Sequence, residues 1–408
     1  MKYLLLFVLL PVLGVAQQAP AEKQAFANRD KYLFSTRPVQ KRFEKTIPFS
    51  YEPNNQIVVP VIIKGKTYHF VFDTGATTVV SKEIAEELAL PSLFKNILQD
   101  GAGVEREETF YNVSDMQIAD IDFKNVAVVA GDMKKFADVL CVNIDGLLGT
   151  NVLRSCYWKV DYSNGQLTFS DREIKPSKDM YAVDFKENFS GTPLLELYMG
   201  KYRVNMFMDT GYTKVLSIPD SLYFRARKEH ERPYVKGYGT TTVTLFGNDP
   251  KEKYVGLLDS VYIFNKRHLL LNPIADIDHA DTYLVGNAVF KGFGQMILDW
   301  KKHRLYLPEK TVDIKEAYPS FGFSPLFVNN QLVVTVVWEG TEAFKKGITV
   351  GSIITAVNGQ DTVNITHETW CGLLDLFGNN KPPEIMISVQ DKGGKITGYT
   401  LKRTELLK

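Results

Sequence analysis

Cysteine is scarce in this sequence, with three in 408 residues. Three cysteines are too few for a disulfide framework of the kind that stabilises small secreted domains. Cys141 and Cys156 flank a segment rich in apolar residues and glycine, so they either pair in an oxidising compartment or remain buried thiols, and we favour buried thiols. The six histidines show no H-x-x-x-H pattern, and no C-x-x-C occurs. We therefore expect no metal site and no cofactor.

An excess of charge of either sign is also missing. Lys and Arg total 48, Asp and Glu total 47, and the net charge is +1. Nucleic acids and acidic membrane surfaces attract strongly basic proteins. We therefore expect neither as the main partner.

Long apolar runs are absent beyond the N-terminus. Residues 4–15 form an apolar run after Lys2, and Gly14-Val15-Ala16 provides a small-x-small cleavage site. This pattern predicts a cleaved signal peptide over residues 1–16, the alternative being an uncleaved anchor. We expect a secreted or periplasmic protein without stable membrane insertion after cleavage. Residues 17–45 are polar, mixed in charge and without sustained periodicity, which predicts a flexible extension.

The sequence does contain one nine-residue motif in two copies. Residues 73–81 and residues 209–217 both read D-T-G-x-T-x-V-[V/L]-S, and each follows an apolar stretch. Gly149 closes a Leu-Leu-Gly segment 76 positions after Asp73, and Gly286 closes a Leu-Val-Gly segment 77 positions after Asp209. These matched spacings predict an internal duplication of about 135 residues and a pseudo-twofold axis between the halves.

The local patterns in both halves are those of strands with few helices. A β-branched run over 56–63, the apolar stretches before each Asp and an Asn-Gly turn at 164–165 predict strands and hairpins. Ser81 is a good N-cap for a helix over 82–90, and Ser217 is predicted to cap a second helix with Pro219 near its first turn. The charged, Pro-containing stretch around 170–181 is predicted to be a linker.

Two symmetric Asp-Thr-Gly turns suggest a specific chemistry. Hydrolysis of a peptide bond without a metal or a nucleophilic side chain needs a base to activate water and an acid to polarise the carbonyl group. Two carboxyl groups held close together do both, because they cannot both ionise and one therefore retains a proton. Gly75 and Gly211 permit the tight turns that would bring Asp73 and Asp209 together.

The two repeats resemble the aspartic peptidases of the pepsin and retropepsin superfamily over about residues 46–310. In that family each lobe supplies one Asp, and an apolar-apolar-Gly segment packs beneath it in a ψ-shaped loop. The resemblance implies that Asp73 and Asp209 are the catalytic pair. It also implies supporting residues, which are the interlocked Thr74 and Thr210 with Gly75 and Gly211. The two ψ-loop segments would be residues 147–149 and 284–286. The short lobes look more like two retropepsin units in tandem than like full pepsin lobes.

The fourth motif position departs from the family, which usually has Ser, Thr or Ala there. Ala76 fits, whereas Tyr212 is bulky and either lines the cleft or marks a second lobe that has lost catalysis. Neither residue offers a hydroxyl to the outer carboxylate oxygen, a bond that would stabilise the charged form and lower its pKa. We therefore predict activity nearer to neutral pH than in acid-loving relatives.

Closing loops need a compliant backbone, which makes two Gly-rich segments candidates for flap tips. They are residues 101–103, ending in Gly103, and residues 237–239, with Tyr238 between two glycines. The alternative for each is an ordinary hairpin turn. Ala76, Tyr212, Gly103 and Tyr238 are the candidate substrate-binding residues.

The C-terminal segment resembles a PDZ domain over about residues 318–403. Phe321-Gly322-Phe323 matches the loop whose backbone N–H groups bind a chain terminus, and residues 350–359 match the family's G-D-x-I-x-x-V-N-G with Ser352 in place of Asp. The implied partners are protein C-termini or exposed peptides; the alternative is a packing domain that binds nothing.

Together these observations predict a mainly β fold: two pseudo-symmetric retropepsin-like β-barrel lobes forming a bilobal aspartic peptidase, plus a C-terminal PDZ domain. The expected lobes span 46–172 and 178–310, and the expected PDZ domain spans 316–405. The predicted function is an aspartic endopeptidase acting on peptide or protein substrates. The competing hypotheses are a non-catalytic peptide-binding protein with a degenerate cleft and a surface-assembly scaffold.

Overall fold

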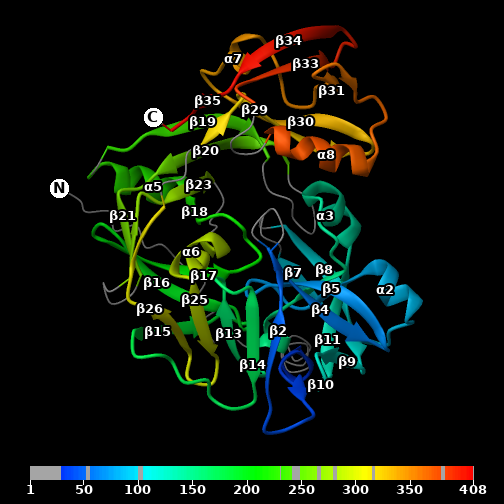
Figure 1. The fold of residues 1–408 in the computed structure, drawn as a ribbon, viewed down its shortest axis with the longest axis vertical. Helices are drawn as coiled ribbons and strands as arrows, with labels where there is room; N and C mark the ends of the chain where they lie inside the picture. Colours follow the sequence, from blue (N-terminus) through cyan, green and yellow to red (C-terminus); the bar gives the residue numbers. More distant parts are fainter. Residues whose placement is uncertain are drawn as a thin grey trace, which may run out of the picture.

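The computed structural model describes residues 29–51, 56–99, 104–229, 231–240, 249–263, 268–278, 283–314, 318–377 and 382–407. It has two β lobes and a C-terminal unit (Figure 1). No helix within these ranges is long and apolar enough to cross a membrane. The predicted signal peptide lies outside the described residues.

Lobe 1 is made of strands with short helices. Its elements are β1 (Arg37–Pro38), β2 (Glu44–Pro48), β3 (Ser50–Tyr51), β4 (Ile57–Ile63), β5 (Lys66–Phe72), β6 (Val79–Ser81), α2 (Lys82–Glu87), β7 (Ser92–Gln99), β8 (Glu105–Val113), β9 (Met116–Ile118), β10 (Ile121–Lys124), β11 (Val126–Gly131), α3 (Met133–Leu140), β12 (Gly146–Leu148), α4 (Thr150–Leu153), β13 (Tyr157–Asp161) and β14 (Gln166–Ser170). Ser81 caps α2 as predicted, since its hydroxyl accepts the Ile84 N–H at 3.2 Å.

Lobe 2 repeats this plan. Its elements are β15 (Met180–Glu187), β16 (Pro193–Met199), β17 (Tyr202–Asp209), β18 (Leu216–Pro219), α5 (Asp220–Arg227), β19 (Tyr234–Gly239), β20 (Lys251–Leu257), β21 (Ser260–Ile263), β22 (His268–Leu271), β23 (Ile274–Asp278), β24 (Leu284–Gly286), α6 (Asn287–Phe293), β25 (Gln295–Asp299), β26 (Arg304–Pro308) and β27 (Thr311–Asp313). The pairing is equivalent in both lobes: β12 runs parallel to β5 and antiparallel to β6, as β24 does to β17 and β18. This equivalence is what a duplication produces.

A central antiparallel sheet joins the lobes. Its strand order is β2-β14-β13-β25-β26-β15, so lobe 1 supplies three strands and lobe 2 supplies three. The joint is the β13–β25 ladder, in which Trp158 pairs with Leu298. Both side chains are fully buried in one apolar core that extends through both lobes. The mainly β fold class predicted from the sequence is confirmed, and the assignment of the C-terminal unit as a PDZ domain stays a prediction.

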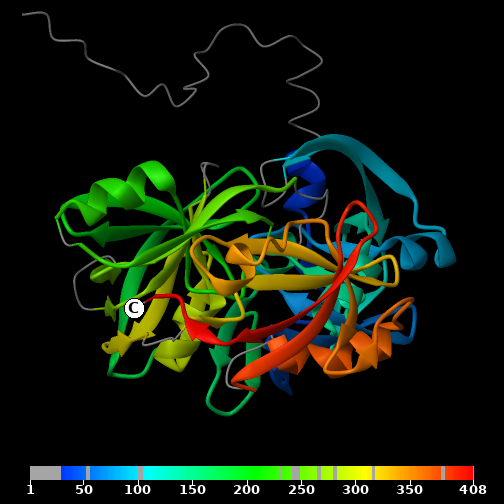
Figure 2. The ribbon, with the colours of Figure 1, turned by 90° about the horizontal axis from the view of Figure 1, so that it is seen from above.

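The C-terminal unit has its own smaller core. Its elements are β28 (Pro319–Ser320), β29 (Phe323–Val328), β30 (Gln331–Trp338), α7 (Glu342–Lys345), β31 (Ile353–Val357), β32 (Gln360–Asp361), α8 (His367–Phe377), β33 (Glu384–Gln390), β34 (Ile396–Lys402) and β35 (Thr404–Glu405). Trp370 and Leu332 lie in this core. The unit lies across one end of the molecule, beside β19 and β20 of lobe 2 and beside α3 of lobe 1 (Figures 1 and 2).

Three sequence-based expectations need correction. The stretch expected to be a flexible extension is structured from residue 29 onwards: Leu33 is buried, and β2 completes the central sheet. Ser217 does not cap a helix, because it lies within β18 and α5 begins only after Pro219. Cys156 is a buried thiol as expected, but Cys141 is not, because it forms a disulfide with Cys371, 230 positions away.

Candidate active site

The two motif aspartates lie at the ends of equivalent strands. Asp73 follows β5, and its N–H donates to the carbonyl of Leu148 at 3.0 Å. Asp209 ends β17, where it pairs with Gly286 of β24. Each Asp is therefore held by the apolar-apolar-Gly strand of its own lobe, which the resemblance assigned to the ψ-loop. The supports are buried strands, which make a rigid base.

The threonines that follow the aspartates exchange hydrogen bonds between the lobes. The Thr74 N–H donates to Thr210 Oγ1 at 3.0 Å, and the Thr210 N–H donates to Thr74 Oγ1 at 3.1 Å. Each hydroxyl then donates to a carbonyl of the other lobe, Thr74 to Met208 at 2.8 Å and Thr210 to Phe72 at 2.7 Å. Both side chains are fully buried. The four bonds fix the position of one Asp-Thr-Gly turn against the other.

The glycines leave room for the opposite carboxyl group. A Cβ on Gly75 would lie 2.5 Å from Asp209 Cγ, and a Cβ on Gly211 would lie 2.4 Å from Asp73 Oδ2. Side chains other than hydrogen do not fit at such distances, so both positions require glycine. The Asp209 carboxyl group lies close enough to Asp73 to raise its pKa. The structure therefore brings Asp73 and Asp209 into one site, as the duplication predicted.

The site favours a retained proton. Burial, and then the neighbouring Asp209, raise the pKa of Asp73 to about 8, although backbone N–H groups oppose the shift. Burial also raises the pKa of Asp209. The backbone donors are Gly75, which donates to Asp73 Oδ1 at 2.8 Å, and Tyr212, which donates to Asp209 Oδ1 at 2.9 Å. They orient each carboxylate while the pair shares a proton.

Tyr212 is anchored away from the carboxyl pair. Its phenol lies 2.9 Å from Asp276 Oδ2, to which it donates, and 3.2 Å from the carbonyl of Leu216. The Lys214 ammonium lies 2.6 Å from the same Asp276 oxygen. Burial would raise the pKa of Asp276, but Lys214 holds it below its ordinary value. Burial, and then this carboxylate, raise the pKa of Tyr212 well above its usual range.

The Asp276 contact was not predicted. Lys214 belongs to the repeated motif, but Asp276 lies 62 positions further on, in β23. Only the parallel pairing of β18 with β23 places Asp276 beside the motif. The one signal that the sequence offered is the place of Asp276 between the apolar residues Ala275 and Ile277.

Lobe 1 holds its turn with different residues. Asn151 Oδ1 accepts the Thr78 hydroxyl at 2.7 Å and the Thr78 N–H at 2.9 Å, and Asn151 Nδ2 donates to the Ala127 carbonyl. The Thr78 hydroxyl oxygen in turn accepts the Gly149 N–H at 3.0 Å. The carbonyl of Ala76 accepts the Thr150 N–H at 2.8 Å, so Ala76 supports the turn with its backbone. Asn151 follows the Leu-Leu-Gly segment in sequence, and that position was its only advance signal.

The flap predictions have separate outcomes. Gly103 lies outside the described residues. The position of the second flap tip was wrong: residues 237–239 are not a turn but part of β19, which pairs with β20 up to Gly239 opposite Lys251. Tyr238 is 53% exposed, so its side chain lies on the open face of this hairpin. Its contact with substrate stays a prediction.

The loop compared with a carboxylate-binding loop is tightly built. Gly322 has φ of 90°, and its N–H donates to Ser320 Oγ at 3.0 Å. Phe321 and Phe323 are both buried. Within the described residues, β29 pairs with β30. Its other edge faces α8 and α3, which both contact β29.

One cluster in the described part of the chain has metal-ligating atoms. They belong to Cys141, His367 and Cys371, and they lie within 4.8 Å of one another. The two sulfur atoms are bonded to each other, so they are not available as thiolate ligands. The paired aspartates and this cluster come from different elements.

Two buried carboxyl groups with raised pKa values, held by equivalent turns of the two lobes, define a paired-aspartate site suited to activating water. Comparison with known families agrees with this class for lobe 1: residues 59–152, which contain Asp73, match the family model described as aspartyl protease. The match ends before Asp209.

Whole-chain comparisons add little to the lobe 1 match. No curated protein matches the sequence. Among solved structures, the crystal structure of basic 7S globulin from soybean is similar to this chain. It is 8% identical, the similarity covers 66% of this chain and 95% of that chain, and the TM-score is 0.41.

Proposed function

We propose that this protein is an aspartic endopeptidase that uses Asp73 and Asp209 together. The observation that carries the proposal is the mutual fit of the turns: each glycine lies against the other lobe's carboxyl group, and the threonines exchange hydrogen bonds. Burying two carboxyl groups beside each other costs free energy, because burial opposes their ionisation. A protein that only binds peptides does not need this arrangement. Acid–base catalysis does need it.

The proposed reaction uses one proton shared by the pair. The ionised carboxylate takes a proton from a water molecule, and the protonated carboxyl donates its proton to the carbonyl oxygen of the scissile peptide bond. The water oxygen attacks the carbonyl carbon and forms a tetrahedral intermediate. A proton passed to the amide nitrogen then lets the C–N bond break. The Gly75 and Tyr212 N–H groups keep the carboxylate oxygens oriented through these steps.

The position of Tyr212 supports catalysis over a purely binding role. The phenol is hydrogen-bonded to Asp276 instead of to either catalytic carboxyl group, and the backbone N–H of Tyr212 still donates to Asp209. The bulky side chain of Tyr212 therefore makes its hydrogen bond away from the carboxyl pair, while its backbone N–H keeps the hydrogen bond to Asp209.

The C-terminal unit and the location of the protein enter the proposal separately. We assign the unit a peptide-binding role on the edge of β29 that faces α8 and α3 and on the loop at Phe321-Gly322-Phe323, with protein C-termini or exposed peptides as partners. The N-terminal sequence supports export, and hence a secreted or periplasmic enzyme.

Cleavage of a peptide library by the full-length protein tests the main proposal. Asp73→Asn and Asp209→Asn should each reduce turnover by at least ~10³-fold, since either change removes one half of the acid–base pair. Asp115→Asn, an exposed carboxylate of lobe 1, is the matched control and should retain full activity.

Hydrolysis in H₂¹⁸O adds a second readout, because direct attack by water places one ¹⁸O atom in each new carboxyl group. If the wild-type protein binds library peptides but cleaves none between pH 3 and 8, the protein is a binding protein instead.

A further inference from the structure

The C-terminal unit is attached to both lobes, but by different means. On the lobe 2 side, β30 extends the sheet of β19: Thr240 N–H donates to Thr335 O at 2.9 Å, and Glu339 N–H donates to Lys236 O at 2.8 Å. Trp338 is buried there in an apolar cluster with residues of β19, β20 and β23. This interface is a continuous sheet with a core, which is a stable form of attachment.

The attachment to lobe 1 is smaller and rests on one covalent bond. The polar contacts between α3 and α8 are long: Trp370 Nε1 lies 3.4 Å from Val139 O, and His367 Nε2 lies 3.4 Å from Ala137 O. The disulfide between Cys141, at the end of α3, and Cys371, in α8, is therefore the main connection. Among the described residues, breaking it leaves these two long hydrogen bonds and the contact of α3 with β29.

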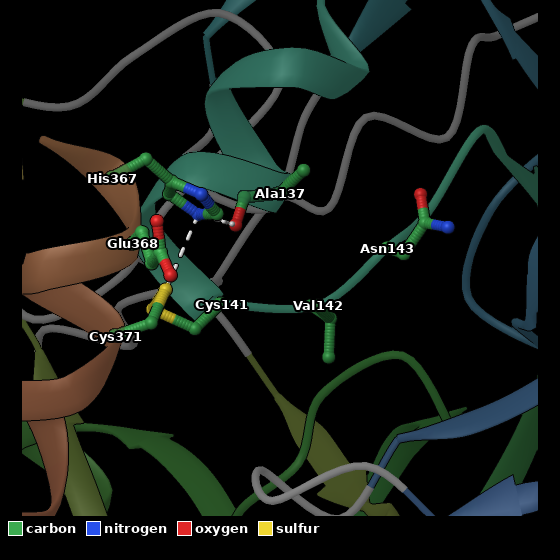
Figure 3. Close-up of a pocket in the computed structure, with 7 residues that line it drawn as sticks. All are labelled: Ala137, Cys141, Val142, Asn143, His367, Glu368 and Cys371. Atoms are coloured by element: carbon green, nitrogen blue, oxygen red, sulfur yellow. Dashed lines mark hydrogen bonds between the residues drawn. A yellow bond between two sulfur atoms is a disulfide. The ribbon is translucent and has the colours of Figure 1, made fainter.

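The disulfide borders a surface pocket. The pocket has a volume of about 510 Å³, and its walls come from α3 with the segment after it and from α8 (Figure 3). Both cysteines are only half-buried. His367 Nε2 lies 3.3 Å from Cys371 Sγ, one helical turn before it in α8. A half-buried disulfide that borders a surface pocket beside an imidazole is an arrangement that favours thiol–disulfide exchange, because the imidazole can stabilise a departing thiolate.

We propose that Cys141–Cys371 is a thiol-exchange site, and that an external dithiol acting there releases lobe 1 from the C-terminal unit. The proposal concerns the joint between the domains and does not depend on peptidase activity. The substrate class is a small or protein-borne dithiol that reaches the pocket.

The exchange balances in two steps. A thiolate of the dithiol attacks Cys141 Sγ; a mixed disulfide forms, the Cys141–Cys371 bond breaks, and Cys371 leaves as a thiolate that accepts a hydrogen bond from His367. The second thiolate of the dithiol then attacks the mixed disulfide and releases the Cys141 thiolate. The two departing thiolates take up the protons of the two thiols. The protein disulfide gains two electrons, and the dithiol becomes a cyclic or protein disulfide.

Lobe 1 connects the disulfide to the paired-aspartate site. Helix α3 follows β11, and β11 runs parallel to β6, the strand directly after the Asp73 turn. With the bond intact, the C-terminal unit is fixed to α3 on one lobe and to β19 on the other, so it restrains movement of the lobes relative to each other. With the bond broken, it remains on lobe 2 alone.

The test uses the full-length oxidised protein with dithiothreitol as the dithiol, read by alkylation and mass spectrometry under native conditions. Cys141 and Cys371 should become alkylated at least tenfold faster than Cys156, whose burial raises the pKa of its thiol to about 12. His367→Gln keeps a hydrogen-bond donor but no protonatable ring, and it should slow reduction at least threefold. Alkylation of all three cysteines at one common slow rate would show that the disulfide opens only when the protein unfolds, and would overturn the proposal.

Hydrogen exchange measures the release itself. After reduction, the amides of residues 133–140 and of α8 should exchange faster, while those of β19 and β30 should stay protected. The double variant Cys141→Ser/Cys371→Ser should show the same pattern without any reductant, and the protected β19–β30 ladder shows that it is folded. Unchanged exchange in α3 in both experiments would contradict the release.

Discussion

At the scale of single residues, the site depends on two glycines having no side chain. In Gly75→Ala the new Cβ would lie 2.5 Å from Asp209 Cγ, so the carboxyl group must move away from its partner. We expect turnover to fall by at least ~10²-fold, because acid–base catalysis requires the pair to stay in hydrogen-bond contact.

The same result is expected for Gly211→Ala, whose Cβ would meet Asp73. Gly398→Ala is the control, since its Cβ would contact nothing within 4 Å. The checks are the steady-state rates and the circular dichroism spectrum of each variant. Full activity in both glycine variants would mean that the carboxyl groups need not stay in place.

The pH dependence of activity follows from the shared proton. Because the pKa of Asp73 is raised to about 8, the pair keeps one proton at neutral pH and loses it as the pH rises through about 8. We therefore expect cleavage to be fastest near neutral pH and to fall on the basic side of about pH 8. The measurement is kcat/KM of one peptide from pH 3 to 9, and a maximum near pH 3 would refute this prediction.

The same shift predicts an effect on stability. The folded pKa of Asp73, about 8, lies above the unfolded value of 3.8, so the native state holds a proton that the unfolded chain releases. This contribution to stability is complete below pH 3.8 and is lost as the pH rises through about 8. Asp73→Asn carries no charge at any pH, so its melting temperature should exceed that of the wild type by ~2–5 °C at pH 8 and should match it at pH 4. Thermal melts at the two pH values check this, and a variant that is less stable than the wild type at pH 8 would contradict it.

How far a residue could be predicted depended on whether its partner was visible in the sequence. Asp73 and Asp209 could be predicted as a pair because the motif repeats with matched spacing. The phenol of Tyr212 could not be assigned, since its partner Asp276 reaches it only through the pairing of β18 with β23. The disulfide was missed for a similar reason: nothing in the sequence near Cys141 points to Cys371 in another domain.

At the scale of elements, hairpins and helices with local signals were predicted well. The Asn-Gly turn does separate β13 from β14, and the helix predicted after Ser81 is α2, although it ends at Glu87 and not at residue 90. The flap segment failed because Gly237 and Gly239 were interpreted as turn residues. They are small for another reason, which is that β30 approaches β19 closely there: a Cβ on Gly239 would lie 1.9 Å from Thr335 O.

That close approach gives a prediction for the joint between β19 and β30. Gly239 has φ of 135°, so Gly239→Ala combines backbone strain with a clash against the strand of the C-terminal unit. We expect the amides of Thr240 and Glu339 to exchange at least tenfold faster, because they donate across this ladder. Tyr238→Ala is the matched control on the same strand, since the side chain of Tyr238 is exposed. Equal protection in Gly239→Ala and the wild type would show that the ladder tolerates the change.

At the scale of the whole molecule, the distribution of apolar cores predicts how the protein unfolds. One core runs through both lobes and the central sheet, and a separate core lies in the C-terminal unit. Residues in a shared core lose their packing together, so the two lobes should unfold as one cooperative unit although the sequence repeats. The C-terminal unit should give a transition of its own in calorimetry.

Two core substitutions assign the transitions. Leu298→Ala removes a fully buried side chain at the β13–β25 joint, and Ile387→Ala removes one that is 3% exposed in β33. Each should cost about 2–5 kcal/mol. Leu298→Ala should lower only the transition of the lobes, and Ile387→Ala should lower only that of the C-terminal unit. If Leu298→Ala instead split the lobes into two transitions, the central sheet would not be what joins them, and the pseudo-symmetric halves would be independent folding units held together chiefly by their threonine contacts.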